Sequence, residues 1–200
     1  MDFRRKIKLK DSSDVLVRTL SIKDVISLNK MFSILSDQSK QFFHPHFVQP
    51  NLGPLWIRDE ILLVLSCFFS IRKLLLRIFP NAVYLSLIGL NSRNEIIAFA
   101  CLRITERLPR GEYVASNGII VRDDYQGRGL GSQLADCRIE FARIHKVEKI
   151  FLQVHAHNVR HISMLRKHGF RLIKTGRKDL WKGKSYPACK MVLDLSERSI

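Results

Sequence analysis

The sequence predicts a mixed α/β fold of the α+β type, with a central, mostly antiparallel sheet of six or seven strands flanked by about four helices. Three observations support this. Apolar strand patterns recur in the second half of the chain, short polar turns separate the first of them, and a glycine-rich loop joins one strand to an amphipathic helix. With 200 residues, 46% of them hydrophobic, the chain can form one domain over residues 1–200. We expect a basic tail over about residues 1–12.

The first predicted helix runs from Ser21 to about Ser36. Ser21 and Asp24 form a capping-box pattern at its start. Apolar residues then recur on one face, at Val25, Leu28, Phe32 and Leu35. We expect this face to pack on the sheet.

Three strands are predicted before the glycine-rich loop. The first two are joined by the polar turn 91–94, which has hairpin length, and the third follows the turn 109–111. Their ranges are Ala82 to Leu90, Glu95 to Thr105 and Glu112 to Val121.

Further elements follow the loop. A helix begins near Ser132, and a strand covers Lys149 to Val154. Asn158 is typical of the N-cap of a short helix, and Gly169 is typical of its C-terminal stop. Two strands, near Arg171 to Thr175 and Tyr186 to Leu195, close the chain.

The loop from Gln126 to Ser132 carries three glycines and predicts a phosphate-binding cradle. Glycines allow the backbone to approach a ligand, and the following helix N-terminus offers unpaired N–H groups. A dinucleotide-binding GxGxxG motif is excluded because Ser132 stands where its last glycine is needed. A P-loop is excluded because Gly-Lys-Ser/Thr is missing.

The pattern Gln126-x-x-Gly129-x-Gly131 resembles the acetyl-CoA motif of the GCN5-related N-acetyltransferases (GNAT family). The spacing from Asn158 to Gly169-Phe170 and the closing hairpin are similar to the same family, so the resemblance covers nearly the whole chain and is weakest over residues 36–80. It implies the acyl-CoA N-acyltransferase fold, with a sheet splayed next to the glycine loop. It also implies direct transfer of an acetyl group from acetyl-CoA to a primary amine of a small molecule, an amino sugar or a protein.

The resemblance also implies which residues hold the cofactor. The strand before the loop would bind the acyl-pantetheine arm, and a backbone N–H there would polarise the thioester carbonyl. The loop would bind the diphosphate. The residues implied are Ile119, Ile120, Val121, Gln126, Gly127, Arg128, Gly129, Leu130, Gly131, Ser132 and Asn158.

One position departs from the family pattern. Leu165 stands where many members carry the tyrosine that protonates the leaving thiolate. Tyr113, a histidine or solvent would then supply the proton, or catalysis is weak. Candidates for the base that deprotonates the amine are Glu112, His44, His46, His155 and His157. Of all these residues, we expect Glu112, Tyr113 and His44 to be catalytic.

A metal site is not expected. His155 and His157 are two residues apart on a predicted strand and would share a face, with His161 nearby. No carboxylate or cysteine is spaced to complete a tetrahedral set with them. The histidines are therefore expected to contact solvent or cofactor phosphate.

The net charge of +16 exceeds what the phosphates of coenzyme A require. The excess indicates an anionic acceptor, contact with nucleic acid or an anionic membrane, or solvated faces without a partner. A rival interpretation is therefore a non-catalytic acyl-CoA-binding module, or a basic protein that docks on RNA or membranes. The segment Ile61–Ile71 is too short to span a bilayer and is either a buried helix or one that contacts a membrane surface or a partner.

The chain is expected to be cytoplasmic. Its first ten residues are charged, with no apolar run behind them, so they do not form a signal peptide. The four cysteines are widely spaced without a CxxC pair, which indicates reduced thiols.

Overall fold

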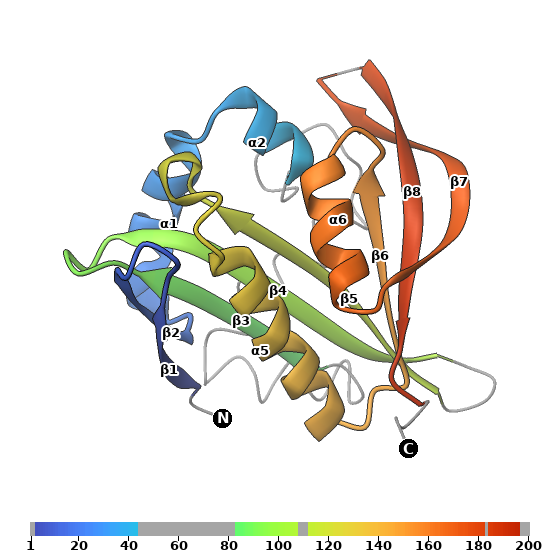
Figure 1. The fold of residues 1–200 in the computed structure, drawn as a ribbon, viewed down its shortest axis with the longest axis horizontal. Coiled ribbons are helices and arrows are strands. Elements are labelled where there is room, and N and C mark those ends of the chain that lie inside the picture. Colours follow the sequence, from blue (N-terminus) through green and yellow to red (C-terminus); the bar gives the residue numbers. More distant parts are fainter. Residues whose placement is uncertain (1–2, 44–82, 108–111, 183, 197–200) are drawn as a thin grey trace.

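The computed structural model describes residues 3–43, 83–107, 112–182 and 184–196. Eight strands form one sheet in the order β1-β2-β3-β4-β5-β6-β8-β7 (Figure 1). All neighbouring strands are antiparallel except β5 and β6. The strands are β1 (Arg4–Lys8), β2 (Asp14–Thr19), β3 (Val83–Leu90), β4 (Ile96–Arg107), β5 (Glu112–Val121), β6 (Lys149–His155), β7 (Arg171–Trp181) and β8 (Lys184–Asp194).

The prediction of a basic tail over residues 1–12 is wrong. Arg4–Lys8 form β1, which pairs with β2, and this hairpin raises the strand count above the predicted six or seven. The strand buries Ile7, and Leu9 follows it into the core, while the residues between and before them carry charges at exposed positions. Residues 6–10 alternate between lysine and an apolar residue, as a half-buried strand does, but the run is short and so highly charged that it resembles a tail.

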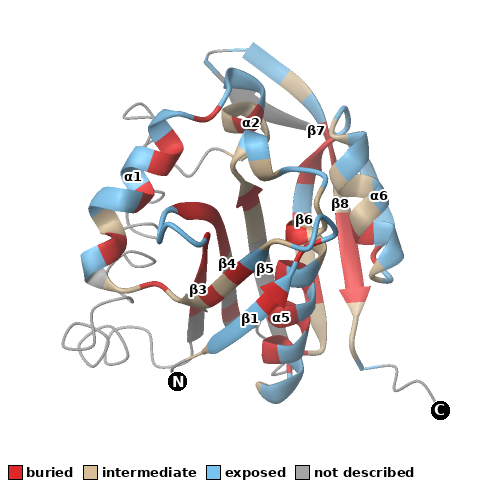
Figure 2. Ribbon diagram, turned by 60° about the vertical axis from the view of Figure 1, so that its left-hand side comes forward, coloured by how far each residue is buried: buried red, intermediate tan, exposed pale blue. Residues whose placement is uncertain are grey.

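Helices cover both faces of the sheet. The helices α1 (Val25–Ser33) and α2 (Asp37–Phe42) lie on one face, and α5 (Leu130–Ile144) and α6 (Val159–Lys167) lie on the other. Strand residues alternate between the two sides: Phe99 packs with α1, whereas Ala98 and Ala100 belong to the core under α5. Figure 2 shows the buried residues along the strands and on the inner sides of the helices. No described helix is long and apolar enough to cross a membrane.

The predicted helix from Ser21 to Ser36 is divided in the structure. A short 3₁₀ helix (Ile22–Asp24) precedes α1, and the chain breaks after Ser33 because the Ser36 hydroxyl accepts a hydrogen bond from the Ser39 N–H (3.2 Å) and thereby caps α2. One of the two hydrogen bonds of the predicted capping box is present. The Asp24 carboxylate accepts the Ser21 N–H at 2.7 Å.

Most other boundaries agree with the sequence patterns. The turn 91–94 joins β3 to β4, with the Asn91 N–H bonded to the Glu95 carbonyl at 3.1 Å. The Asn158 side chain caps α6 by accepting the His161 N–H at 3.1 Å, and the helix ends two residues before Gly169. The three cysteines in the described part of the chain are free thiols.

We predict that Asp24→Asn destabilises the fold. Arg18 donates two hydrogen bonds of 2.7 Å to this largely buried carboxylate, so the substitution leaves a partly buried guanidinium without its charge partner. The free energy of unfolding in urea should fall by about 2 kcal/mol at neutral pH. The hydrogen bond from Arg18 holds the pKa of Asp24 below its usual range. The stabilisation should therefore be lost, and the two proteins should converge, as the pH falls below about 4.

The matched control is Asp37→Asn. Asp37 pairs with Lys182 at 3.1 Å, but both side chains are more than half exposed. This substitution should change the free energy of unfolding by less than about 0.5 kcal/mol. Equal losses in the two variants would contradict the prediction.

Candidate cofactor and active site

The sheet opens between β5 and β6. These two strands pair at only three positions, from Val114↔Lys149 to Ser116↔Phe151. Beyond that point β5 stays paired with β4 as far as Val121, and β6 stays paired with β8 as far as His155, so the two halves of the sheet diverge. The edge of β5 from residue 117 onward therefore offers peptide groups without a strand partner on that side. This is the splay that the family resemblance implies.

The strand residues at the opening alternate between the two faces. Ile119 and Val121 pack against the core under α5, while Ile120 is buried under α1. Gly118 is crowded from the α1 side, since a Cβ there would stand 2.5 Å from a ring carbon of Phe43. The absence of a side chain at Gly118 lets the aromatic ring close over the strand.

A short 3₁₀ helix (Asp123–Tyr125) and the glycine loop connect β5 to α5. Gly127 and Gly129 have φ values of +85° and +92°, which only glycine adopts without strain, and Gly129 is the N-cap of α5. Leu130 is buried and anchors the first turn. The N–H groups of that turn have no carbonyl partner within the helix and carry its partial positive charge. The loop is therefore suited to bind an anion.

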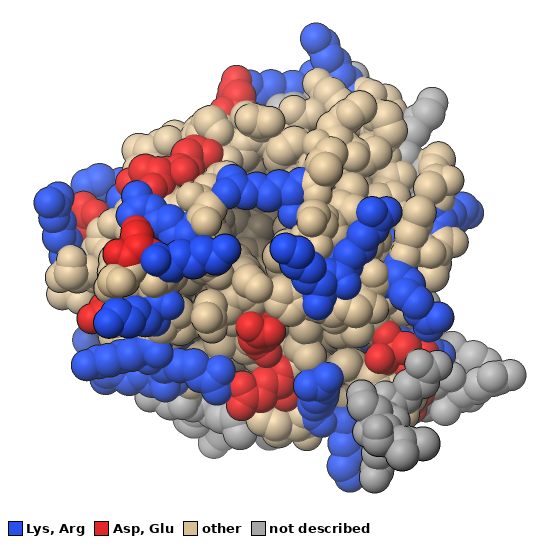
Figure 3. Space-filling view, in the orientation of Figure 1, with Lys and Arg blue, Asp and Glu red and all other residues tan. Residues whose placement is uncertain are grey.

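Two basic side chains approach these glycines. The Arg160 guanidinium, from α6, lies 2.5 Å from where a Cβ of Gly127 would stand, and the Lys10 side chain lies 3.5 Å from that of Gly129. Neither cation forms an ion pair or side-chain hydrogen bond with another described residue. In Figure 3, Lys and Arg side chains surround a hollow between the loop and α6. These features fit the diphosphate of coenzyme A.

Lys10 was missed by the sequence analysis. It reaches the loop because its N–H donates to the Arg128 carbonyl at 3.0 Å, which holds the β1–β2 turn against the start of α5. No local signal marks this contact, since the two residues are more than a hundred positions apart.

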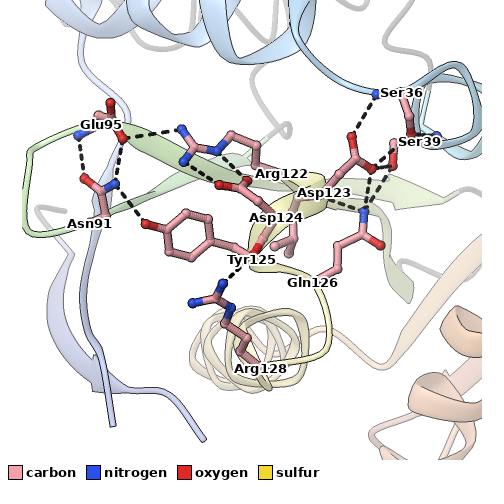
Figure 4. A network of polar contacts seen from close by, with 11 residues as sticks. Ser36, Ser39, Asn91, Glu95, Arg122, Asp123, Asp124, Tyr125, Gln126 and Arg128 are labelled. Carbon is pink, nitrogen blue, oxygen red and sulfur yellow. Dashed lines mark hydrogen bonds and ion pairs between the residues drawn. The ribbon is translucent and has the colours of Figure 1, made fainter. Parts of the chain in front are cut away.

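The Arg128 side chain supports the loop from within the protein. Its guanidinium donates to the Asp11 carboxylate and to the Asp124 carbonyl, both at 2.7 Å, and lies over the Tyr125 ring. The Tyr125 hydroxyl in turn accepts a hydrogen bond from Asn91 at 3.1 Å (Figure 4). Of the predicted cofactor residues, Arg128 thus has its side chain engaged in holding the loop.

Gln126 and Asp123 tie the loop to α2. The Gln126 amide donates to the Ser39 hydroxyl at 3.0 Å and to the Asp123 carboxylate at 3.1 Å. Asp123 also accepts hydrogen bonds from the Ser36 N–H and from the hydroxyls of Ser36 and Ser39 (Figure 4). Burial raises the pKa of Asp123, but these hydrogen bonds outweigh burial and the pKa lies below its usual range. The carboxylate is thus ionised at neutral pH.

The start of α5 is also joined to the end of α6. His168 Nδ1 donates to the Met164 carbonyl at 2.7 Å, and Nε2 lies 3.2 Å from both the Ser132 hydroxyl and a carboxylate oxygen of Asp136. Ser132 is one of the predicted cofactor residues. The contact fixes the spacing of the two helices that border the opening.

Two of the predicted catalytic residues lie far from the opening of the sheet. Glu112 and Tyr113 stand at the other end of β5, six and five residues before Gly118, so their backbones lie roughly 16–20 Å from it along the strand. Their side chains lie outside the described residues, as do His44 and His46. Leu165 is fully buried in the core.

The expectation that His155 and His157 share a strand face is wrong. β6 ends at His155, and His157 is exposed in the turn that follows. His155 is buried instead, with its ring between those of Phe42 and Tyr186 at 5.7 Å from each. Apolar strand patterns do not show where the last strand residue lies.

Comparisons with known proteins agree with this geometry. The model of the acetyltransferase (GNAT) family matches residues 57–170. Among solved structures, ribosomal-protein-S5-alanine acetyltransferase from Vibrio fischeri is 11% identical, with a TM-score of 0.68 and 98% of each chain covered. The GNAT domain of S. lividans PAT is 19% identical, with a TM-score of 0.65, covering 96% of this chain and 97% of that one.

A third structure, yncA from Salmonella typhimurium, was solved with its cofactor acetyl-CoA. It is 17% identical, with a TM-score of 0.63, and 94% of this chain and 98% of that one are covered. No curated protein matches the chain in sequence. Since the family model matches more than half of the chain, this protein belongs to the acetyltransferase (GNAT) family, which uses acetyl-CoA as the acetyl donor.

Proposed function

We propose that the protein is an N-acetyltransferase that passes the acetyl group of acetyl-CoA directly to a primary amine. One observation carries the proposal. The glycine loop lies a few residues after Val121, beyond the short 3₁₀ helix, at the end of the strand whose unpaired edge borders the opening between β5 and β6. A coenzyme whose diphosphate lies on the loop would extend its pantetheine arm along residues 119–121 and place its thioester near Gly118.

The chemistry needs three contributions from the protein. An alkyl ammonium with a pKa near 10 costs about 4 kcal/mol to deprotonate at pH 7, so a base or a chain of waters must accept its proton. An unpaired N–H on the edge of β5 would polarise the thioester carbonyl, which is typically worth ~10²–10³ in rate. The leaving thiolate must also be stabilised.

Two of the three described cysteines are poor nucleophiles. A covalent acetyl-enzyme requires a reactive thiolate. Burial raises the pKa of the Cys137 and Cys189 thiols, which disfavours the thiolate at both positions. We therefore propose attack by the amine itself in a ternary complex.

The acceptor would approach from the side of the sheet covered by α1 and α2, where Phe43 closes over Gly118. The net charge of +16 favours a neutral or anionic amine over a polyamine. The similar Vibrio fischeri enzyme is named for an alanine of ribosomal protein S5, so an N-terminal peptide belongs among the acceptors to be tested.

A second candidate function is acyl-CoA binding without turnover. It is favoured by Leu165, a fully buried side chain without a proton to donate where many family members have a tyrosine.

Turnover separates the two candidates. The full chain is incubated with acetyl-CoA and, separately, with amino sugars, amino acids, N-terminal peptides and spermidine, and the release of free thiol is followed. We expect acceptor-dependent release, fastest with a neutral or anionic amine. Binding of acetyl-CoA without release for any amine would support the binding module instead.

We predict that Arg160→Ala weakens acetyl-CoA binding by roughly 5- to 20-fold in calorimetry. The reason is the loss of a cation beside Gly127, where the diphosphate would lie. Arg166→Ala is the matched control. Arg166 is also exposed on α6, and its substitution removes the same charge. The difference between the two should shrink at high salt. Equal weakening would show that only net charge matters.

We also predict that Gly129→Ala and Gly131→Ala behave differently. Alanine at Gly129 must adopt a φ of +92°, which costs of order 1–3 kcal/mol and distorts the loop. Gly131 lies within the helix, and a Cβ there would meet only Val121 at 3.9 Å. Calorimetry with coenzyme A should therefore show binding weakened or lost in the first variant and largely kept in the second. The opposite order would disprove the assignment of Gly129.

A further inference from the structure

Arg138 is a buried cation that has no carboxylate partner among the described residues. It projects inward from α5 and is 2% exposed. Its Nη1 donates to the Gly118 carbonyl at 3.0 Å and to the Cys101 carbonyl at 3.3 Å, whereas its Nε makes no hydrogen bond within the described part of the chain. Burial lowers the pKa of Arg138 to about 10, so the guanidinium remains charged at neutral pH. A buried charge of this kind is costly, and its retention calls for an explanation.

The location of Arg138 offers an explanation for this buried charge. Gly118 lies two residues beyond Ser116, the last residue of β5 that pairs with β6. The guanidinium that holds the Gly118 carbonyl is therefore at the point where the sheet begins to open. A thioester near Gly118 would have this positive charge close to its sulfur.

Two residues of α6 complete this environment. His161 and Leu165 are four positions apart and so lie on the same side of the helix. Burial, and to a smaller extent the charge of Arg138, lower the pKa of His161 to about 4. The imidazole is therefore neutral at pH 7. It can donate a hydrogen bond, but it holds no acidic proton to give away.

We propose that Arg138 stabilises the coenzyme A thiolate as it leaves, and that the His161 side chain donates a hydrogen bond to the same sulfur. The inference rests on the function proposed above. These two residues would replace the tyrosine that is missing at Leu165, by stabilising the charge on sulfur instead of protonating it.

The transfer forms an amide bond and breaks the thioester bond. The lone pair of the amine forms the bond to the thioester carbonyl carbon, and the C–S bond breaks with its electron pair leaving on sulfur. The amine loses its proton to a base or to solvent. The thiolate remains ionised beside Arg138 and takes a proton from solvent after release.

The thiol pKa of bound coenzyme A tests the proposal directly. Coenzyme A labelled with ¹³C at the carbon bonded to sulfur is titrated with pH, free and bound to the full chain, and the chemical shift is followed by NMR. A positive charge within a few ångströms lowers a thiol pKa by roughly 1–3 units. We expect a lowering of at least about 1 unit in the complex. A bound thiol with the same pKa as the free one, or a higher pKa, would overturn the proposal.

Variants identify the source of the shift. Arg138→Met should return the thiol pKa to the free value or above it, Arg138→Lys should keep part of the lowering, and His161→Ala should lose a smaller part. Arg143→Met, at an exposed position of the same helix, should leave the lowering intact. A full lowering that persists in Arg138→Met would overturn the role of Arg138. A purely structural role in holding the two carbonyls would not move the thiol pKa.

The two proposals fail in different ways. Calorimetry that shows no binding of coenzyme A to the wild-type protein would defeat the proposed function. Coenzyme A that binds with an unshifted thiol would defeat only the present inference. If Arg138→Met does not fold, as judged by circular dichroism, Arg138→Lys takes its place as the test of the guanidinium, and an unshifted thiol on the wild-type protein still overturns the inference.

Discussion

The short parallel pairing of β5 with β6 is the constraint on which the rest of the site depends. Each strand keeps its outer partner over its whole length, so the sheet cannot close where the inner pairing stops at Ser116. The backbone groups on this inner edge need partners from outside the sheet. The same divergence creates room for Arg138 to reach the Gly118 carbonyl and places the glycine loop at the end of an open edge. Binding of the coenzyme, activation of its thioester and stabilisation of the thiolate would all follow from the short pairing between these two strands.

The glycine loop is held from both sides by polar contacts that involve no ligand. The Arg128 guanidinium joins it to the β1–β2 turn, and Asp123 joins it to the start of α2. Loop side chains that the motif would assign to the cofactor are used to fix the backbone. The loop can then bind an anion through its backbone N–H groups, and Lys10 and Arg160 are the nearby cations. Affinity would thus come from a preformed backbone and from the cations at its rim.

Local signals made much of the fold predictable. The hairpin turn at Asn91, the cap at Asn158 and the glycine conformations depend on residues close in sequence, and the structure confirms them. β1 could not be predicted, because charges surround its one buried side chain, Ile7. The site was only half predictable for a similar reason. Gly129 carries its own geometric signature, whereas Lys10, Arg138 and His161 acquire their surroundings from elements far along the chain.

The contacts of Asp123 limit which substitutions this protein can accept near the glycine loop. The single Asp123 carboxylate receives hydrogen bonds from the start of α2, on the proposed acceptor side, and from Gln126 of the glycine loop. The two surfaces are therefore not independent modules. Replacing Ser36 or Ser39 to change acceptor preference would also remove donors from the carboxylate that orients the loop. Substitutions at these positions are epistatic with position 123. A grafted acceptor segment would need to bring hydroxyl donors that match this carboxylate, or the coenzyme site would be perturbed by a change made on the opposite face.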